Sequence, residues 1–275
     1  RFFKATLSEY GINITNLAGG TTDSGPDVKA MFVNFLLALH DVWWHWCDCH
    51  LATKAAEHAF GISADPQKFK KPGARSIFTL ITKTTARVNQ SSSFKQKFEE
   101  LQLDMLDEVL KITKHSNHRW LSMVRMLERI IRLWHVFRRL LVELGEKFLL
   151  EEDDNKNAVL QLYSILHPLS AITRDGEFGD VPITAEMLMA FAVLKMKVLD
   201  PSKPLRLGKT RKGEKPPLPS RLVQPDDLYP VTVATRKELS KALVQRFYGR
   251  VWDSNTDDPS PFRDLAVMLT PPFNT

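Results

Sequence analysis

Strand-forming patterns are confined to about the first 60 residues of this 275-residue chain, which limits the folds that it can adopt. The stretch 12–17 alternates loosely between apolar and polar residues and leads into 18–23, which predicts a short strand ending at Asp23. The aromatic segment 42–51 predicts a second, buried strand, because tryptophan and its neighbours suit a pleated surface. A two-stranded sheet is only marginally stable by itself. The pattern of residues 1–61 therefore predicts part of an α/β domain and not a complete one.

Helical patterns dominate the rest of the chain. From Phe94 onward, apolar residues recur at steps of three and four, the spacing of one buried helix face. Gly11 and Gly61 are expected to end two helices, and the helix over 119–150 is expected to break near Gly145. The predicted class is mainly α with a small α/β part. Helices are expected over residues 1–10, 27–39, 53–60, 94–114, 119–150, 158–166, 185–199 and 231–248.

The chain is basic, with 38 lysines and arginines against 32 acidic residues and a formal net charge of +6. Eight basic residues and no acidic ones fall between Pro66 and Lys97. This distribution is compatible with a polyanion partner. Residues 63–75 predict a loop, and residues 200–230, rich in proline, lysine and arginine, predict a long loop or a disordered insert.

Two cysteines, Cys47 and Cys49, are too few for a disulfide scaffold and favour a reducing compartment. The longest apolar run, Met31 to Leu39, is interrupted by Asn34 and is too short to cross a bilayer, so no membrane partner is expected. The chain starts at Arg1 without a signal peptide, and we expect it to begin inside a longer protein.

Asp23 is the first candidate for chemistry. A carboxylate at the carboxyl end of a strand, followed by the turn Ser24-Gly25-Pro26, lies at the edge of a sheet where sites are usually built. Hard cations such as Mg²⁺ take carboxylate oxygens, and metal-dependent phosphoryl transfer needs them at such positions. The alternative is that Asp23 only caps the turn, which is the commoner role for an isolated aspartate.

The C-x-x-H spacing of Cys47 and His50 is the second candidate. A zinc site would need further cysteine or histidine ligands close by, and His58 lies eight residues on, on a predicted helix. The alternative to a metal site is a buried strand, in which Cys47 packs against its neighbours and His50 is hydrogen-bonded.

Several basic residues are candidates for contacts with nucleic acid. Arg119 and Trp120, at a predicted helix start, would hold a phosphate and stack on a base; otherwise Trp120 packs in the core. One further candidate group lies on a single helical face and comprises Arg125, Arg129 and Arg132, which could follow a phosphate backbone or could only be solvated. The other belongs to the basic stretch and comprises Lys70, Lys71 and Arg75.

The order of these motifs resembles that of the hAT transposase family. A Thr-Thr-Asp that ends a strand precedes the C-x-x-H by some two dozen residues, and the Arg-Trp pair opens a helix with a Met-Leu-Glu-Arg run. Further likeness spans nearly the whole chain, in residues 10–12, 162–169, 173 and 265–273.

The resemblance implies a ribonuclease-H-like catalytic domain, of which 1–61 is a part, joined to an α-helical insertion over 62–275. Complete family members hold two divalent ions, Mg²⁺ or Mn²⁺, with two aspartates and a glutamate. Asp23 matches the second aspartate, a catalytic metal ligand, and Cys47 and His50 match the C-x-x-H, whose histidine lies near the active site. Arg119 and Trp120 match a pair that approaches DNA. DNA is thus the expected partner, and the nucleus the expected location.

The departures from the family pattern define the alternatives. The first aspartate is expected before residue 1 and the glutamate beyond Thr275, so we expect no DNA cleavage by this chain alone. The zinc-binding finger and the dimerisation segment of the family are also absent, so any homo-oligomer would use segments outside the chain. Thr270 and Pro272 replace an aspartate and an arginine of the family's end motif. The alternative is a domesticated, non-catalytic module of helices that binds DNA or protein.

Overall fold

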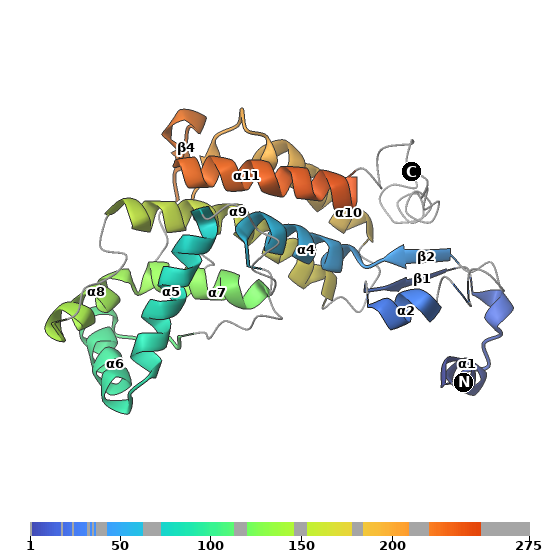
Figure 1. The fold of residues 1–275 in the computed structure, drawn as a ribbon, viewed down its shortest axis with the longest axis horizontal. Coiled ribbons are helices and arrows are strands. Elements are labelled where there is room, and N and C mark those ends of the chain that lie inside the picture. Colours follow the sequence, from blue (N-terminus) through green and yellow to red (C-terminus); the bar gives the residue numbers. More distant parts are fainter. Residues whose placement is uncertain are drawn as a thin grey trace.

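The computed structural model of the chain describes residues 2–17, 19–23, 25–31, 34, 36, 43–62, 73–112, 120–145, 153–177, 184–208 and 220–248. These residues form a mainly helical protein with two small sheets of two strands each. The helices make one elongated body, and the first sheet projects from one end of it, on the right in Figure 1. Across the described residues, no helix has both the length and the apolar character that a bilayer span requires.

The first sheet and its two short helices form the projecting end. Helix α1 (Phe2–Glu9) is confirmed, and Gly11 follows it in a left-handed conformation with φ of 65°. Strand β1 (Gly19–Thr22) pairs in parallel with β2 (Trp43–Trp46), so that Thr22 lies opposite Trp46. Helix α2 (Pro26–Met31) follows β1. This end has a small apolar cluster of its own, made by Leu36 with Ile14, Leu17, Val28 and Met31.

The strand predicted over 42–51 is wrong in its second half, because helix α4 (Asp48–Phe60) begins there. Strand β1 ends at Thr22, so a longer β2 would have no partner, and Asp48 brings a carboxylate to the first helical turn, where it is favoured. The cysteine-histidine motif therefore lies at the start of a helix. Gly61, with φ of 64°, ends α4 as predicted.

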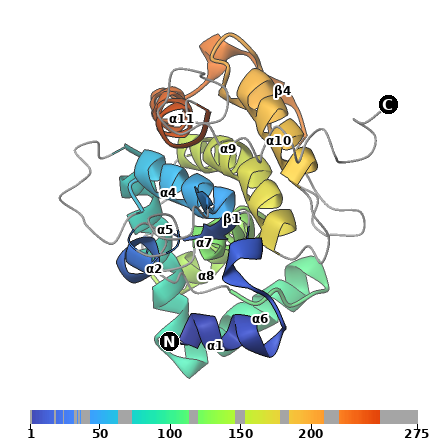
Figure 2. The same ribbon diagram turned by 90° about the vertical axis from the view of Figure 1, so that its right-hand side faces the viewer.

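Helix α4 joins the sheet to the helical body. It packs against α9 (Asp153–Glu177) and α11 (Pro230–Leu243), as Figures 1 and 2 both show. The small side chains of Ala52, Ala55 and Ala56 are completely buried at these contacts. Helix α4 thus belongs to the main core, although the sequence pattern groups it with the α/β part.

Helices α5 (Gly73–Asn89), α7 (Trp120–Arg132) and α10 (Thr184–Val193) pack against α9. Helix α6 (Ser92–Leu106) packs mainly against α8 (Trp134–Glu143). Helix α5 was not predicted from the sequence, although Ile77, Ile81 and Val88 are buried at helical spacing. The helix predicted over 94–114 ends earlier, because Asp107 adopts a left-handed conformation with φ of 54°.

The helix predicted over 119–150 ends near Gly145 as expected, since α8 ends at Glu143 and Gly145 has a φ of 66°, but it is also interrupted at Leu133. Five successive residues, Ile130 to Trp134, are buried. Continuous burial does not by itself require a break, because the uninterrupted helix α9 buries nine successive residues, 158–166. The interruption is local to Leu133, whose φ of −93° and ψ of 13° separate α7 from α8.

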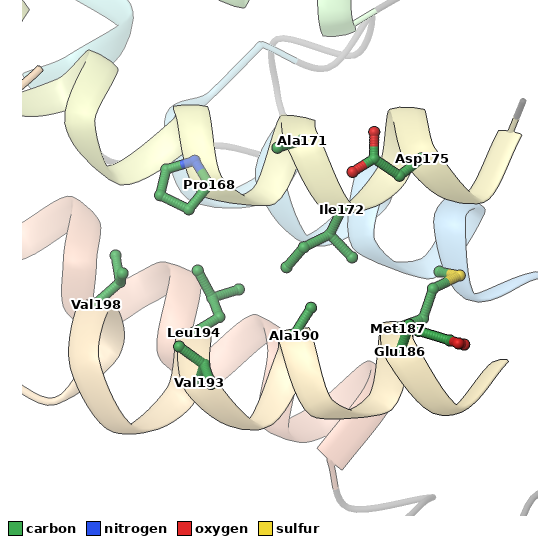
Figure 3. Close-up of a pocket in the computed structure, with 10 residues that line it drawn as sticks. All are labelled: Pro168, Ala171, Ile172, Asp175, Glu186, Met187, Ala190, Val193, Leu194 and Val198. Carbon is green, nitrogen blue, oxygen red and sulfur yellow. The ribbon is translucent and has the colours of Figure 1, made fainter. Parts of the chain in front are cut away.

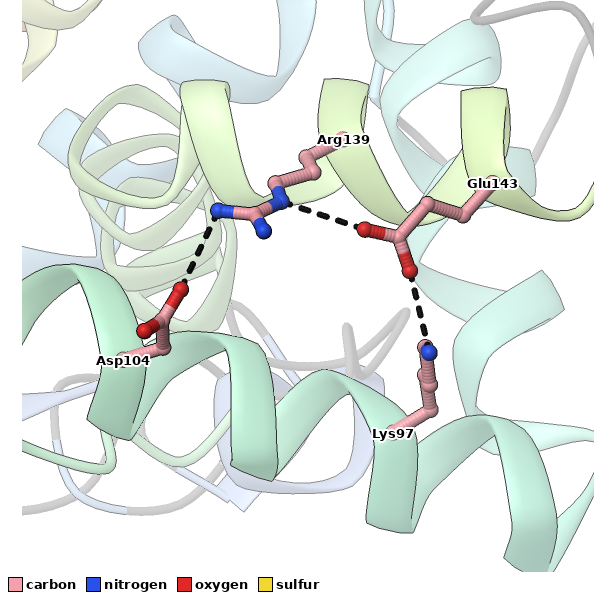
Figure 4. A network of polar contacts seen from close by, with 4 residues as sticks. All are labelled: Lys97, Asp104, Arg139 and Glu143. Atoms are coloured by element: carbon pink, nitrogen blue, oxygen red, sulfur yellow. Dashed lines mark hydrogen bonds and ion pairs between the residues drawn. The ribbon is translucent and has the colours of Figure 1, made fainter.

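Charged side chains link α6 to α8 at the surface (Figure 4). Arg139 pairs with Asp104 at 3.1 Å and with Glu143 at 3.1 Å, and Glu143 also pairs with Lys97 at 3.0 Å. The hydrogen bonds that Glu143 accepts lower its pKa; the one from Lys97 has the largest effect, followed by the one from Arg139. Because exposed pairs contribute little, we assign the stability of this helix pair mainly to the contact below them, where the rings of Phe98 and Phe137 lie 4.6 Å apart.

The parts of 200–230 next to the helices are ordered, in contrast to the predicted loop. Strand β3 (Leu205–Arg206) pairs antiparallel with β4 (Leu222–Val223), and Leu205 and Val223 are buried. The Ser164 hydroxyl of α9 accepts a hydrogen bond from the Gly208 amide at 2.9 Å. Residues 209–219 lie outside the described part.

Gly176 lets three helices meet closely. A Cβ atom at this position would lie 2.6 Å from Cys49 Sγ of α4 and 2.8 Å from Met187 Sδ of α10. We expect Gly176→Ala to destabilise the protein by about 1–3 kcal/mol, as overpacked cores do, despite the better helix propensity of alanine. Denaturant unfolding of the variant measures this loss.

The control is the same Gly176→Ala substitution made in a Cys49→Ala variant. Removing the sulfur frees the space, so Gly176→Ala should be clearly less destabilising there than in the native chain. Equal losses in both backgrounds would show that the three helices do not meet at Gly176.

Candidate functional site at the edge of the first sheet

Parallel pairing brings the carboxyl ends of β1 and β2 to one edge of the sheet. The Cys47 amide donates a hydrogen bond to the Thr22 carbonyl at 2.7 Å, so the pairing continues to the first residue after β2. Asp23 follows β1 directly, and His50 lies in the first turn of α4. The two predicted catalytic positions therefore lie at the same edge, close enough for the charge of Asp23 to influence the pKa of His50. This edge faces the helical body (Figure 1).

Asp23 is exposed and shapes the turn after β1. Its Oδ1 accepts a hydrogen bond from the Gly25 amide at 3.0 Å, the turn-capping role considered from the sequence. A Cβ at residue 25 would lie 3.0 Å from the same oxygen, so the turn favours glycine. The carboxylate stays accessible at the edge while one oxygen holds the turn.

His50 is half-buried, and its pKa is lowered. Burial is the largest cause and the positive charge of Lys54 the next, whereas Asp23 and Glu57 act in the opposite direction. Lys54 also pairs with Glu57 at 2.8 Å. His50 is thus mainly neutral at pH 7, able to donate with one ring nitrogen and accept with the other.

Cys47 has the most perturbed pKa at this edge, lowered well below its usual range to about 6. The largest cause is a hydrogen bond with the Cys49 thiol, and the His50 and Cys49 amides add to it, against burial and the charge of Asp48. Cys49 is buried, and its Sγ lies 3.6 Å from the Thr173 carbonyl. Its single S–H can serve either the Cys47 sulfur or that carbonyl. The sequence pattern did not predict the low pKa of Cys47, because it placed both cysteines on a strand.

A divalent ion needs more carboxylates than the described residues at this edge provide. In the described ranges, no group of three or more His, Cys, Asp or Glu side chains is placed to hold a metal ion. Asp23 supplies one carboxylate, with one oxygen already bonded to Gly25. The described residues by themselves therefore do not fit the two-metal site of the resemblance, and we derive no metal-dependent step from them.

The structure changes the expectation for the arginine face of α7. Arg125 is exposed and Arg129 half-buried. The Arg132 side chain is 1% exposed and pairs with Glu128 at 3.2 Å. Arg132 is therefore buried beside Glu128, where it cannot reach a DNA backbone.

The other candidates for DNA binding are described only in part. Arg75 lies half-buried in the first turn of α5, against Gly61 at the end of α4. Trp120 begins α7, close to the predicted helix start. Lys70, Lys71 and Arg119 lie outside the described residues.

Comparisons with models of known protein families, with characterised proteins and with solved structures find no match to this chain.

The thiolate of Cys47 can be tested by alkylation with iodoacetamide. The rate should rise with pH through a midpoint near 6, because only the thiolate reacts and a lowered pKa keeps it populated. Cys47→Ala should leave only slow labelling of buried Cys49. In Cys49→Ala the midpoint should move upward, since the thiolate loses its main hydrogen bond, and an unchanged midpoint would exclude that cause.

The electrostatic arrangement around His50 can be tested by NMR titration of its ring protons. Lys54→Met should raise the pKa of His50, because it removes a repelling positive charge, and Asp23→Asn should lower it. Asp27→Asn is the control, since Asp27 is exposed on α2 and is not among the groups that shift His50. If Asp23→Asn and Asp27→Asn gave the same result, Asp23 would not lie beside His50.

Proposed function

We propose that the chain is the DNA-binding core of a hAT transposase-like protein, with a ribonuclease-H-like domain interrupted by a helical insertion. The observation that best supports this is the placement of Asp23 and His50 at the carboxyl ends of two paired parallel strands, from which α4 leads into an all-helical body. This pairing is consistent with the order of motifs on which the resemblance rests.

Helix α7 supports the same proposal. Its first residue is Trp120, and its starting end is the one directed toward the first sheet (Figure 1). The start of α7 is therefore the end of that helix nearer to the first sheet. In this proposal, one DNA segment contacts both.

In this proposal, different residues bind different parts of the DNA. Arg119 and exposed Arg125 neutralise phosphates, which gives affinity without sequence preference. Trp120 stacks on an unpaired base, because an extruded base needs an aromatic platform. Neutral His50 offers a hydrogen bond at the sheet edge. The nucleus is proposed as the location on the basis of the family resemblance.

Asp23 would hold a divalent ion, Mg²⁺ or Mn²⁺, only together with further carboxylates that the family places outside 1–275. Strand cleavage is thus a proposal for a longer protein, and DNA binding is the proposal for this chain. The alternative is a non-catalytic helical module that binds DNA or protein; its DNA-binding form shares this part of the proposal and lacks cleavage.

DNA binding can be measured by fluorescence anisotropy with two probes, a perfect duplex and the same duplex with an unpaired base. Affinity should fall steeply between roughly 50 and 200 mM salt, because released counterions drive binding to phosphates. Arg125→Ala should weaken both probes and lower the salt slope by about 0.9. Trp120→Ala should weaken the unpaired probe by about tenfold and the duplex much less.

Lys237→Ala is the matched control for charge, since Lys237 is exposed on α11, on the opposite side of the body from α7 in Figure 1. It should leave both affinities nearly unchanged. Affinity that is flat with salt, or an equal loss in Arg125→Ala and Lys237→Ala, would contradict the proposed interface.

A further inference from the structure

Two adjoining hollows form a groove along α9, on the side of α10. Their volumes are about 530 and 660 Å³, and they share Pro168, Val193 and Val198. Figure 3 shows the first hollow between α9 and α10, with Pro168 and Val198 at one end and Asp175 and Glu186 at the other. The second continues past Pro168 to the β3–β4 hairpin.

The groove exposes apolar side chains to water. Val193 is 45% exposed, Met196 58% and Leu222 53%, and all three line the second hollow. Clustered exposed apolar residues in a concave surface mark binding sites more often than isolated ones do. Methionine suits such a surface, because its flexible side chain adapts to a partner.

The two ends of the groove carry opposite charges. Asp175 and Glu186 line the first hollow, where Asp175 also contacts its neighbour Arg174 at 3.6 Å. Lys197, Lys203 and Arg206 line the second hollow, and Lys203 and Arg206 come from the residues at β3. An occupant must therefore match an acidic end, an apolar middle and a basic end.

Buried polar contacts hold the basic wall in place. Arg236 of α11 is buried and donates hydrogen bonds to the Val198 carbonyl and, at 3.0 Å from each terminal nitrogen, to the Lys203 carbonyl. These bonds tie the π-helical turn Leu194–Leu199 to the residues before β3. The groove is therefore preformed, which lowers the entropy cost of binding.

The length and the charges of the groove fit a short helix. From Ser164 to Asp175, α9 runs roughly 16 Å, about three turns of a helix laid alongside it. The positive N-terminus of such a helix is favoured beside Asp175 and Glu186, and its negative C-terminus beside the basic end. DNA fits poorly, because the two carboxylates would repel its phosphates.

We propose that this groove binds an amphipathic helix of a partner protein. The occupant has about three turns, apolar residues at steps of three and four toward Val193 and Met196, basic residues in its first turn and acidic residues in its last. The site is separate from the proposed DNA interface and does not depend on it.

A displayed library of helix-forming peptides of about 12 residues, selected on the full chain, tests this proposal. Selected peptides should carry acidic residues toward their C-termini and should bind the native chain in anisotropy measurements. Val193→Lys should weaken binding by about tenfold or more, and Lys203→Glu with Arg206→Glu should do the same. Both variants should retain native DNA affinity, so that the peptide and DNA proposals can fail separately.

Matched controls lie on α11, outside both hollows. Val233→Lys changes a valine that is 43% exposed, close to the 45% of Val193, and Lys237→Glu with Lys241→Glu reverses two exposed lysines. Their peptide affinities should stay within about twofold of the native chain. Equal losses in groove and control variants, or selected peptides that lack the charge order, would overturn the proposal. So would a dimer of the chain that Val193→Lys dissociates, since the groove would then bind a second copy.

Discussion

The hydrogen-bonded register between β1 and β2 is the constraint on which the candidate site depends. Thr22 lies opposite Trp46, and the Cys47 amide closes the pairing on the Thr22 carbonyl. That bond fixes where the strand ends and α4 begins, and hence where His50 lies relative to Asp23. A sheet of two strands is marginal alone. We therefore assign its support to α4, whose buried alanines anchor one end of the edge in the helical core.

Much of the helical fold follows from periodicity, and its exceptions have local causes. The helices over 94–106 and 230–243 were predictable, because their apolar residues recur at steps of three and four. The boundary after Trp46 was not, since Cys47, Cys49 and Leu51 also satisfy the alternation of a strand. The break at Leu133 was not predictable either, because no glycine or proline marks it in the sequence.

The candidate site was predictable in position but not in chemistry. The family resemblance implied that His50 lies near the active site of Asp23, although the sequence pattern placed His50 inside a strand and not in the first turn of a helix. The low pKa of Cys47 could not be foreseen, because it depends on a thiol and two amides that converge only in a helical turn. Arg132 looks like a member of a surface stripe, yet it is buried beside Glu128. The groove combines residues of α9, α10 and the β3–β4 hairpin that no local motif connects.

Together these features describe a small sheet edge held against a helical body, with an accessible carboxylate, a neutral histidine and a thiolate at the junction. The bond from the Cys47 amide to the Thr22 carbonyl is its central contact. An NMR measurement of the scalar coupling across this hydrogen bond, between the Cys47 nitrogen and the Thr22 carbonyl carbon, tests it most directly. The account predicts a resolved coupling and a slowly exchanging Cys47 amide. An absent coupling with a rapidly exchanging amide would contradict it.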